Sequence, residues 1–370
     1  MIRIFINGLG NVSPQETAIS REGLAPASAF LDTPRCYETN RMKCIDPDYK
    51  AFIPAEQLRR MGRIIKMGIA AARLCMNDAG AGPDNTQQNQ VSPDAIITGT
   101  GLGCLEDTEK FLTSMIKNRE EFLTPTSFIQ STHNTVAGQI ALQLRCHNYN
   151  FTYVHRGISF ESALTDAITQ MQLGEISNAL AGGADELTSG SFEIMSRLGF
   201  WKQKPISTLN LLDDHQRGTI AGEGASFVFL ENEQRAHTYA ELRGVTTFLK
   251  PATNREISLR LHEFLARHEL LPGNIDLVLA GLNGDPRSDL VYHDLIETDF
   301  PNTPLAFFKH LCGEYPTATA FAVWLASMIL KTRTVPEATR INHPPDHLRH
   351  ILIYNHFREN NHAFILLSQL

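Results

Sequence analysis

Short apolar segments with the character of β-strands alternate with helical segments along the chain, and this alternation runs through two successive series. The first series ends before the polar stretch 232–236, and the second begins at residue 239. Strands separated by helices are typical of α/β proteins with mostly parallel, buried sheets. A chain of 370 residues is also long enough for two domains or two fused halves. We therefore expect an α/β fold with residues 1–235 and 236–370 as its two units.

The apolar periodicity predicts individual elements in both series. In the first series we expect strands at 2–7, 94–98, 150–155, 179–181 and 226–230, and helices at 54–80, 136–144 and 159–173. In the second we expect strands at 239–248, 275–280, 350–355 and 362–367, and helices at 255–269 and 316–330. Gly8-Leu9-Gly10 is interpreted as a tight turn after the first strand. The proline-containing stretch 22–54 is expected to have little regular structure.

Composition argues against several classes of function. No apolar run reaches the ~18 residues that a membrane span needs, and Met1–Ile6 resembles a strand more than a signal peptide, so we expect a cytoplasmic protein. A net charge of -7 argues against general binding of nucleic acid. The six cysteines contain no CxxC pair, which predicts free thiols and no metal site. The glycine cluster 99–103 has no following Gly-Lys-Ser/Thr, so we expect no nucleotide cofactor.

Four cations recur at helical spacing in an otherwise acidic chain: Arg59, Arg60, Arg63 and Lys66. Two interpretations remain open for them. They would form a solvated helix face, as charged helix residues commonly do, or a contact surface for an acidic partner protein.

Six segments, taken in chain order, resemble the β-ketoacyl synthases. They are Gly8–Pro14, Met61-Gly62-Arg63 through Asp78-Ala79-Gly80, Thr98–Gly103, Asn134–Gly138, Ala181–Glu186 and Asp213-x-x-x-x-Gly218-x-x-x-Gly222-Glu223-Gly224-Ala225. The resemblance runs over nearly the whole chain. It implies a thiolase-like fold of five layers, α-β-α-β-α, made of two duplicated halves, and a dimer. It also implies an activity that joins acyl chains on acyl carrier protein to malonyl units.

The resemblance implies three kinds of catalytic group. A cysteine begins a buried helix, where the helix dipole stabilises its thiolate. Two histidines hydrogen-bond the malonyl thioester carbonyl during loss of carbon dioxide. A glycine-rich loop near the C-terminus completes the oxyanion hole with a backbone N–H.

This chain departs from the family pattern at each of these groups. An ungapped register on the helix 159–173 places Gly157 at the cysteine position. Gly281 stands for the first histidine, in a loop that otherwise keeps the family frame. Glu314 stands for the second histidine, although Lys309 of the same motif is retained. The sequence therefore predicts a site without its nucleophile or either histidine.

The oxyanion loop departs as well. The chain has no glycine after Gly313, and the stretch that matches the family's Gly-Phe-Gly-Gly is residues 355–361. Non-glycine residues avoid positive φ at a cost of roughly 1–2 kcal/mol. We therefore expect this loop to have a different shape.

These losses resemble the condition of a partner subunit, the chain-length factor, which lacks the cysteine and pairs with an active ketosynthase in type II polyketide systems. The first hypothesis is thus a non-catalytic, chain-length-factor-like subunit in fatty-acid or polyketide (polyene) biosynthesis. The alternative is a β-ketoacyl synthase or acyltransferase with relocated groups, in which Cys312, Cys104 or Ser159 is the nucleophile. A homodimeric binding or scaffolding protein for acyl carrier protein remains as a third possibility.

The resemblance also implies partners and a tunnel. We expect a heterodimer with an active ketosynthase or a homodimer, formed through the apolar strand 150–155, and contact with acyl carrier protein. The segment before the interface helix crosses toward the neighbouring active site in this family. Phe128 and Ile129 are therefore candidates for an apolar tunnel end, and His133 and Asn134 for hydrogen bonds across the interface.

Overall fold

The structure is a computed structural model that describes residues 2–15, 33–80, 92–121, 123 and 125–370. Its described residues form a ten-stranded sheet and a separate two-stranded ribbon of β2 and β6. The strands are β1 (Phe5–Val12), β2 (Glu38–Thr39), β3 (Ala95–Gly99), β4 (Tyr149–Tyr153), β5 (Asn178–Asp185), β6 (Ile206–Ser207), β7 (Gly224–Glu231), β8 (Ala240–Leu249), β9 (Leu277–Ala280), β10 (Leu305–Phe307), β11 (His350–Phe357) and β12 (Asn361–Ser368).

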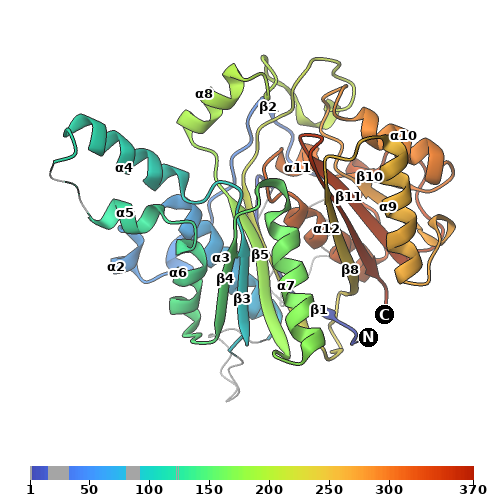
Figure 1. Ribbon diagram of the computed structural model, residues 1–370, viewed down its shortest axis with the longest axis horizontal. Coiled ribbons are helices and arrows are strands. Elements are labelled where there is room, and N and C mark those ends of the chain that lie inside the picture. Colours follow the sequence, from blue (N-terminus) through green and yellow to red (C-terminus); the bar gives the residue numbers. More distant parts are fainter. Residues whose placement is uncertain (1, 16–32, 81–91, 122, 124) are drawn as a thin grey trace.

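Helices cover both faces of the large sheet (Figure 1). They are α2 (Ala55–Leu58), α3 (Arg63–Asp78), α4 (Leu105–Lys117), α5 (Pro125–Ser131), α6 (Thr135–Leu144), α7 (Ser159–Leu173), α8 (Ser189–Arg197), α9 (Asn254–Arg267), α10 (Leu290–Asp299), α11 (Lys309–Cys312) and α12 (Thr319–Thr332). Of the helices in the described ranges, none is both long and apolar enough to span a membrane.

The two halves of the chain repeat one strand pattern. The order is β4-β3-β5-β7-β1 in the first half and β10-β9-β11-β12-β8 in the second, which is third-second-fourth-fifth-first in both. In each half the second strand is parallel to the third and fourth, and the fifth is antiparallel to the fourth and first. This repeat agrees with the expected pair of duplicated, thiolase-like halves. The boundary at 235/236 stays a prediction.

The expectation of mostly parallel sheets is wrong. In each half the last strand, β7 or β12, returns antiparallel between the parallel trio and the first strand. The halves meet through β1 and β8, which pair antiparallel at Phe5↔Glu241 and Ile6↔Ala240. The sheet is therefore mixed.

Alternating side chains place the helices in layers. In β3, Ile97 packs in the central core with α7 and α12, whereas Ile96 packs on the other face with α3 and α6. In β11, Ile353 packs in the same central core, whereas Leu352 packs against α9 and α10. Residues 319–330 of α12 are all buried, as a helix between two sheet halves must be. The five layers are thus α3/α6, half sheet, α7/α12, half sheet and α9/α10.

The glycines near the start of the chain do not form the expected turn. Gly8 and Gly10 lie inside β1. A Cβ atom on Gly10 would lie 2.0 Å from the carbonyl oxygen of Ala71, and one on Gly8 would lie 2.5 Å from that of Cys75. These glycines therefore allow α3 to pack closely on the strand.

Two other predicted boundaries were also wrong. The predicted helix 54–80 is two helices, α2 and α3, and Gly62 between them has an extended backbone (φ -60°, ψ 162°). A Cβ on Gly62 would lie 2.2 Å from Oδ2 of Asp107, so this break lets α3 begin against α4. The short strand predicted at 179–181 extends over Asn178–Asp185.

Helices α4 and α5 form a projection that we call the arm (105–117 and 125–131). The arm stands away from the sheet at the left of Figure 1. Its two helices pack on each other through Phe111 and Phe128, whose ring centroids lie 5.3 Å apart. Several of its apolar side chains remain exposed, including Leu112 (48%), Ile116 (80%), Phe128 (55%) and Ile129 (60%).

The two edges of the large sheet differ. At one edge, β10 makes a further antiparallel bridge from Ala306 to Arg340, and the N–H of Ile341 donates to the carbonyl of Leu305 at 2.9 Å. At the other edge lies β4, which pairs with β3 on its inner side. The rings of Tyr149, Phe151, Tyr153 and His155 follow one another along one face of this edge.

Candidate functional site

The position expected for the nucleophile lies just before α7. Gly157 is buried in a single 3₁₀ turn, Arg156–Ile158, that leads into the helix. A Cβ atom at this position would lie 2.2 Å from Cβ and 2.6 Å from Cγ of Phe357. Phe357 is the last residue of β11, so the space for a side chain at 157 is filled from a strand of the other half.

The first histidine position is filled in the same way. A Cβ on Gly281 would lie 2.2 Å from Oδ1 of Asn355 and 2.7 Å from the hydroxyl of Tyr292. The Asn355 amide donates to Oγ1 of Thr319 at 2.7 Å, and the Tyr292 hydroxyl accepts the N–H of His356 at 2.9 Å. These side chains are tied to α12 and β11, so they fill the position with a fixed polar network.

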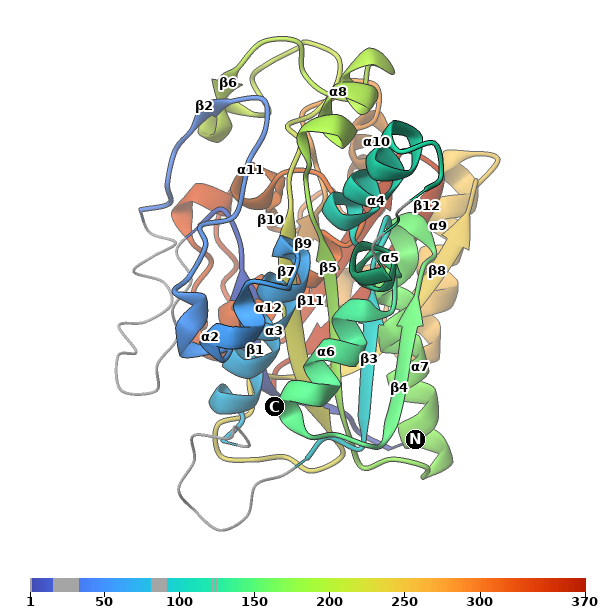
Figure 2. The same cartoon turned by 90° about the vertical axis from the view of Figure 1, so that its left-hand side faces the viewer.

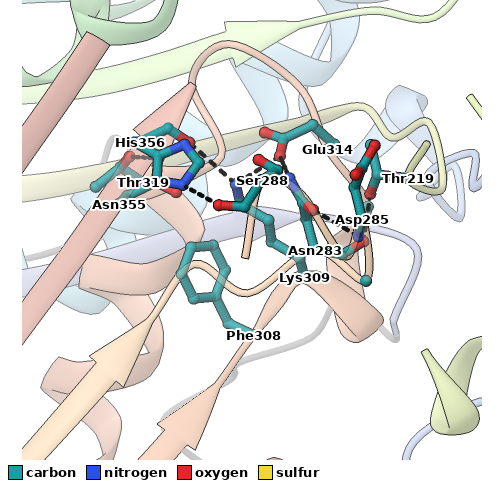
Figure 3. Close-up of polar contacts among 12 residues, drawn as sticks. Thr219, Asn283, Asp285, Ser288, Phe308, Lys309, Glu314, Thr319, Asn355 and His356 are labelled. Atoms are coloured by element: carbon teal, nitrogen blue, oxygen red, sulfur yellow. Dashed lines mark hydrogen bonds and ion pairs between the residues drawn. The ribbon is translucent and has the colours of Figure 1, made fainter. Parts of the chain in front are cut away.

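The retained lysine pairs with the residue that stands for the second histidine. Nζ of Lys309 lies 2.6 Å from Oε2 of Glu314, and both side chains are buried. The amide of Asn283 donates to the same oxygen at 3.0 Å, and Nζ also approaches the carbonyl of His356 at 3.4 Å (Figure 3). A buried ion pair of this kind depends on both partners, because either charge left alone would be costly. The positive charge of Lys309 is thus paired with the Glu314 carboxylate inside the site.

His356 lies beside this pair, within the stretch 355–361 that matches the family's oxyanion loop. Its Nε2 lies 3.0 Å from the carbonyl oxygen of Ser288 (Figure 3). Its ring stacks on that of Tyr292, with the ring centroids 4.4 Å apart. Burial lowers the pKa of His356 well below the usual value, helped by the nearby charge of Lys309. The ring is therefore neutral and held in place.

The loop after β11 adopts positive φ angles without any glycine. Arg358 and Glu359 both have positive φ, at 54° and 55°, and the N–H of Asn360 donates to the carbonyl of Phe357 at 3.3 Å. This is the geometry of a type I′ turn. The inference that non-glycine residues would avoid positive φ here is wrong. The Arg358 guanidinium stacks 3.5 Å from the ring centroid of Phe200, which helps to hold the turn.

Three residues were alternative nucleophiles, and all are fully buried. Burial raises the pKa of the thiols of Cys104 and Cys312, whereas the reactive form of cysteine is the thiolate. The hydroxyl of Ser159 donates to the carbonyl of Arg156 and accepts the N–H of His155, both at 2.8 Å. The serine therefore caps the turn before α7.

Glu161 is a site residue that the sequence reasoning missed. It lies one helical turn after Gly157 and is fully buried, and its carboxylate oxygens have no hydrogen-bond partner among the described residues. Burial raises the pKa of Glu161 to about 7, against a smaller opposing effect of the Thr319 hydroxyl and the Lys309 charge. The sequence did carry a signal of this burial, because Glu161 lies beside the apolar positions Phe160 and Leu164 of the same helix.

The proposed tunnel residues lie apart from this buried cluster. Phe128 and Ile129 are exposed on α5, and His133 and Asn134 are exposed at the start of α6. The His133 ring packs over Gly103, where an added Cβ would lie 2.7 Å from its Cδ2. The structure thus brings together positions 157, 281, 309 and 314, and leaves the other four residues on the outer surface.

Comparison with known proteins places this geometry in a family. The model of the β-ketoacyl synthase N-terminal domain matches residues 12–236. The chain belongs to the β-ketoacyl synthase family. It is 23% identical to 3-oxoacyl-[acyl-carrier-protein] synthase 2 of Synechocystis sp. over 248 residues, 63% of this chain and 58% of that protein. It is 26% identical to Nodulation protein E of Rhizobium sp. over 198 residues, 52% of this chain and 46% of that one. The chain thus spans about half the length of these relatives.

Solved structures of ketosynthases share the fold over the whole chain. The ishigamide ketosynthase/chain length factor superposes with a TM-score of 0.82 at 21% identity, covering 100% of this chain and 99% of that one. A ketosynthase in complex with its chain length factor from Xenorhabdus doucetiae gives 0.78 at 16% identity, covering 100% and 98%. The expected thiolase-like fold is therefore confirmed.

Proposed function

We propose that this chain is a non-catalytic, chain-length-factor-like subunit that pairs with an active β-ketoacyl-ACP synthase in type II fatty-acid or polyketide biosynthesis. The observation that carries the proposal is the contact between Gly157 and Phe357. Without a side chain at 157 there is no nucleophile, and the Phe357 ring lies where one would stand. The absence of histidine at 281 and 314 supports the same conclusion.

The exposed surface supports pairing with another subunit. β4 is an edge strand with exposed aromatic side chains, and such an edge promotes aggregation when nothing covers it. The arm beside it carries exposed apolar side chains on both of its helices. The fold neighbour from Xenorhabdus doucetiae is itself a ketosynthase in complex with its chain length factor. A heterodimer through β4 and the arm would bury these surfaces, with Phe128 and Ile129 facing the partner's tunnel.

The cationic cluster supports contact with acyl carrier protein, although only part of it is free to do so. Arg63 forms ion pairs with Glu223 and Asp46, so it belongs to the structure of this subunit. Arg59 and Arg60 are exposed beside α2. Another fold neighbour is an acyl carrier protein in complex with its ketosynthase. We assign Arg59 and Arg60 to the contact with this acidic carrier.

The proposal is tested by reconstitution. The purified chain is incubated with acyl and malonyl carrier proteins, alone and together with a ketosynthase that retains its cysteine and both histidines. Mass spectrometry should find no acyl adduct on this chain, and sedimentation should show a complex with the ketosynthase that makes product only when both chains are present. An adduct on Cys104, Cys312 or Ser159 would instead support the relocated enzyme. If the chain remains a stable monomer in the presence of the ketosynthase, the partner role is excluded.

A further inference from the structure

The base of the arm is where α4 leaves the body of the molecule. Cys104 occupies the N-cap position of α4, and its side chain makes no capping hydrogen bond. The first amides of a helix need acceptors, and a side-chain oxygen usually supplies one. In α4 the acceptor comes from another part of the chain, because Oε1 of Glu186 accepts the N–H of Glu106 at 2.9 Å.

Glu186 is buried, with 7% of its surface exposed, and it directly follows β5. A second bond joins the same segment to α4, because the hydroxyl of Thr188 donates to the carboxylate of Glu109. The positive end of the α4 dipole favours the charged form of Glu186, whereas burial and the neighbouring carboxylates of Glu106 and Glu223 raise its pKa to about 7. The connection from β5 to α8 therefore holds the first turns of α4.

The residue before Glu186 fixes this connection to the centre of the molecule. Asp185 is buried and accepts the hydroxyl of Thr100 at 3.0 Å and the N–H of Gly101 at 2.8 Å. Its other oxygen accepts the N–H of Thr317 at 3.0 Å and the Thr317 hydroxyl at 2.8 Å, just before α12. Neighbouring carboxylates thus link the central layer to the base of the arm. Figure 2 shows α4 beside the segment that leads from β5 to α8.

We propose that Glu186 is a positioning residue that sets the direction of the arm, and hence where Phe128 and Ile129 stand in the partner's tunnel. The second part of this inference rests on the proposed function, whereas the first does not. Glu186 is buried, with its carboxyl group turned to the start of α4. It acts through the first turn of α4, and the packing of Phe111 on Phe128 carries that position to α5.

Hydrogen exchange on the full chain alone tests the first part. Glu186→Ala removes the acceptor for the Glu106 amide, and amides of 105–117 should exchange roughly fivefold faster, the effect expected for loss of one helix cap. Glu186→Gln keeps a carbonyl oxygen at the same place and should stay within about twofold of the wild type. Glu193→Ala is the matched control, because Glu193 is an exposed α8 carboxylate that pairs only with Arg197 among the described residues. It should leave 105–117 unchanged.

Product analysis with the active ketosynthase tests the second part. The pair containing Glu186→Ala should release a wider range of chain lengths, and Glu186→Gln should restore the wild-type range. Unchanged exchange at 105–117, or exchange raised equally in α3 and α7, would overturn the role of Glu186. If exchange changes only at 105–117 but no variant pairs with the ketosynthase, the role of Glu186 stands and the proposed function is rejected. If the variants pair with the ketosynthase and exchange changes only at 105–117, but the product chain lengths stay the same, the link between Glu186 and the partner's tunnel is rejected.

Discussion

Neighbouring residues fill the side-chain space at two of the positions that the sequence assigns to catalytic groups. Phe357 fills the space at Gly157, and Asn355 with Tyr292 fills the space at Gly281. That these glycines replace catalytic groups could be argued from the sequence, because the register of the flanking motifs needs no gap, and it stays a prediction. The residues that fill the space could not be predicted, since Phe357 lies 200 positions away in the chain and reaches the site only through sheet pairing. The ion pair between Lys309 and Glu314 could not be predicted from the sequence either.

Restoring the nucleophile should therefore cost stability without restoring activity. In Gly157→Cys, the new Cβ overlaps Cβ of Phe357, and overpacking of this kind typically costs about 1–3 kcal/mol. We expect a lower free energy of unfolding in urea and no condensation activity. The double variant Gly157→Cys with Phe357→Ala serves as the control and should be less destabilised than the sum of its single changes. A Gly157→Cys variant as stable as the wild type would show that Phe357 moves aside freely.

At the level of elements, the sequence predicted the strands and helices of the layered core better than the elements attached to that core. The helix 159–173 agrees residue for residue, and Gly174 marks its C-terminal end with a left-handed backbone (φ 75°). Helices α4, α5, α8 and α10 were missed. The arm helices present apolar residues to solvent, so their pattern does not match a helix packed against a core.

The arm should affect products more than stability. Ile129 is 60% exposed, so Ile129→Ala should change the free energy of unfolding of the isolated chain by no more than about 0.5 kcal/mol. Phe128→Ala also removes the contact with Phe111 and should cost about 0.5–1.5 kcal/mol. In the reconstituted pair either change should lengthen the product, because it removes volume from the proposed tunnel end. Leu259→Ala, at an equally exposed leucine on α9, is the matched control for both measurements. Unaltered chain lengths in both arm variants would contradict the tunnel assignment.

At the level of the whole molecule, the two halves meet around a buried carboxyl group. Glu161 comes from α7 of the first half, whereas Lys309 and Thr319 come from the second. Burial raises the pKa of Glu161 to about 7, so the folded protein holds a proton that the unfolded chain releases near pH 4.5. The stabilising effect of this proton is complete below the unfolded pKa and is lost as the pH rises through the folded value.

The variant Glu161→Gln keeps the shape of the side chain and does not titrate. Wild type should lose stability relative to this variant between pH 4.5 and 7, by up to about 3 kcal/mol, and the difference should stay constant at higher pH. Urea unfolding of both proteins at pH 5, 6, 7 and 8 measures it. Parallel stability curves for the two proteins across this range would mean that Glu161 is charged or hydrated in the folded state.

The contrast between the two sheet edges limits how large an assembly can grow. β10 is already bridged by Arg340, so among the described strands of the large sheet only β4 offers a free row of backbone groups. A molecule with two open edges can add copies at both ends and build a fibril, whereas one with a single open edge acts like a chain terminator. Once β4 has found one strand, no acceptor edge remains for the next molecule. We therefore expect association through the large sheet to stop at two subunits.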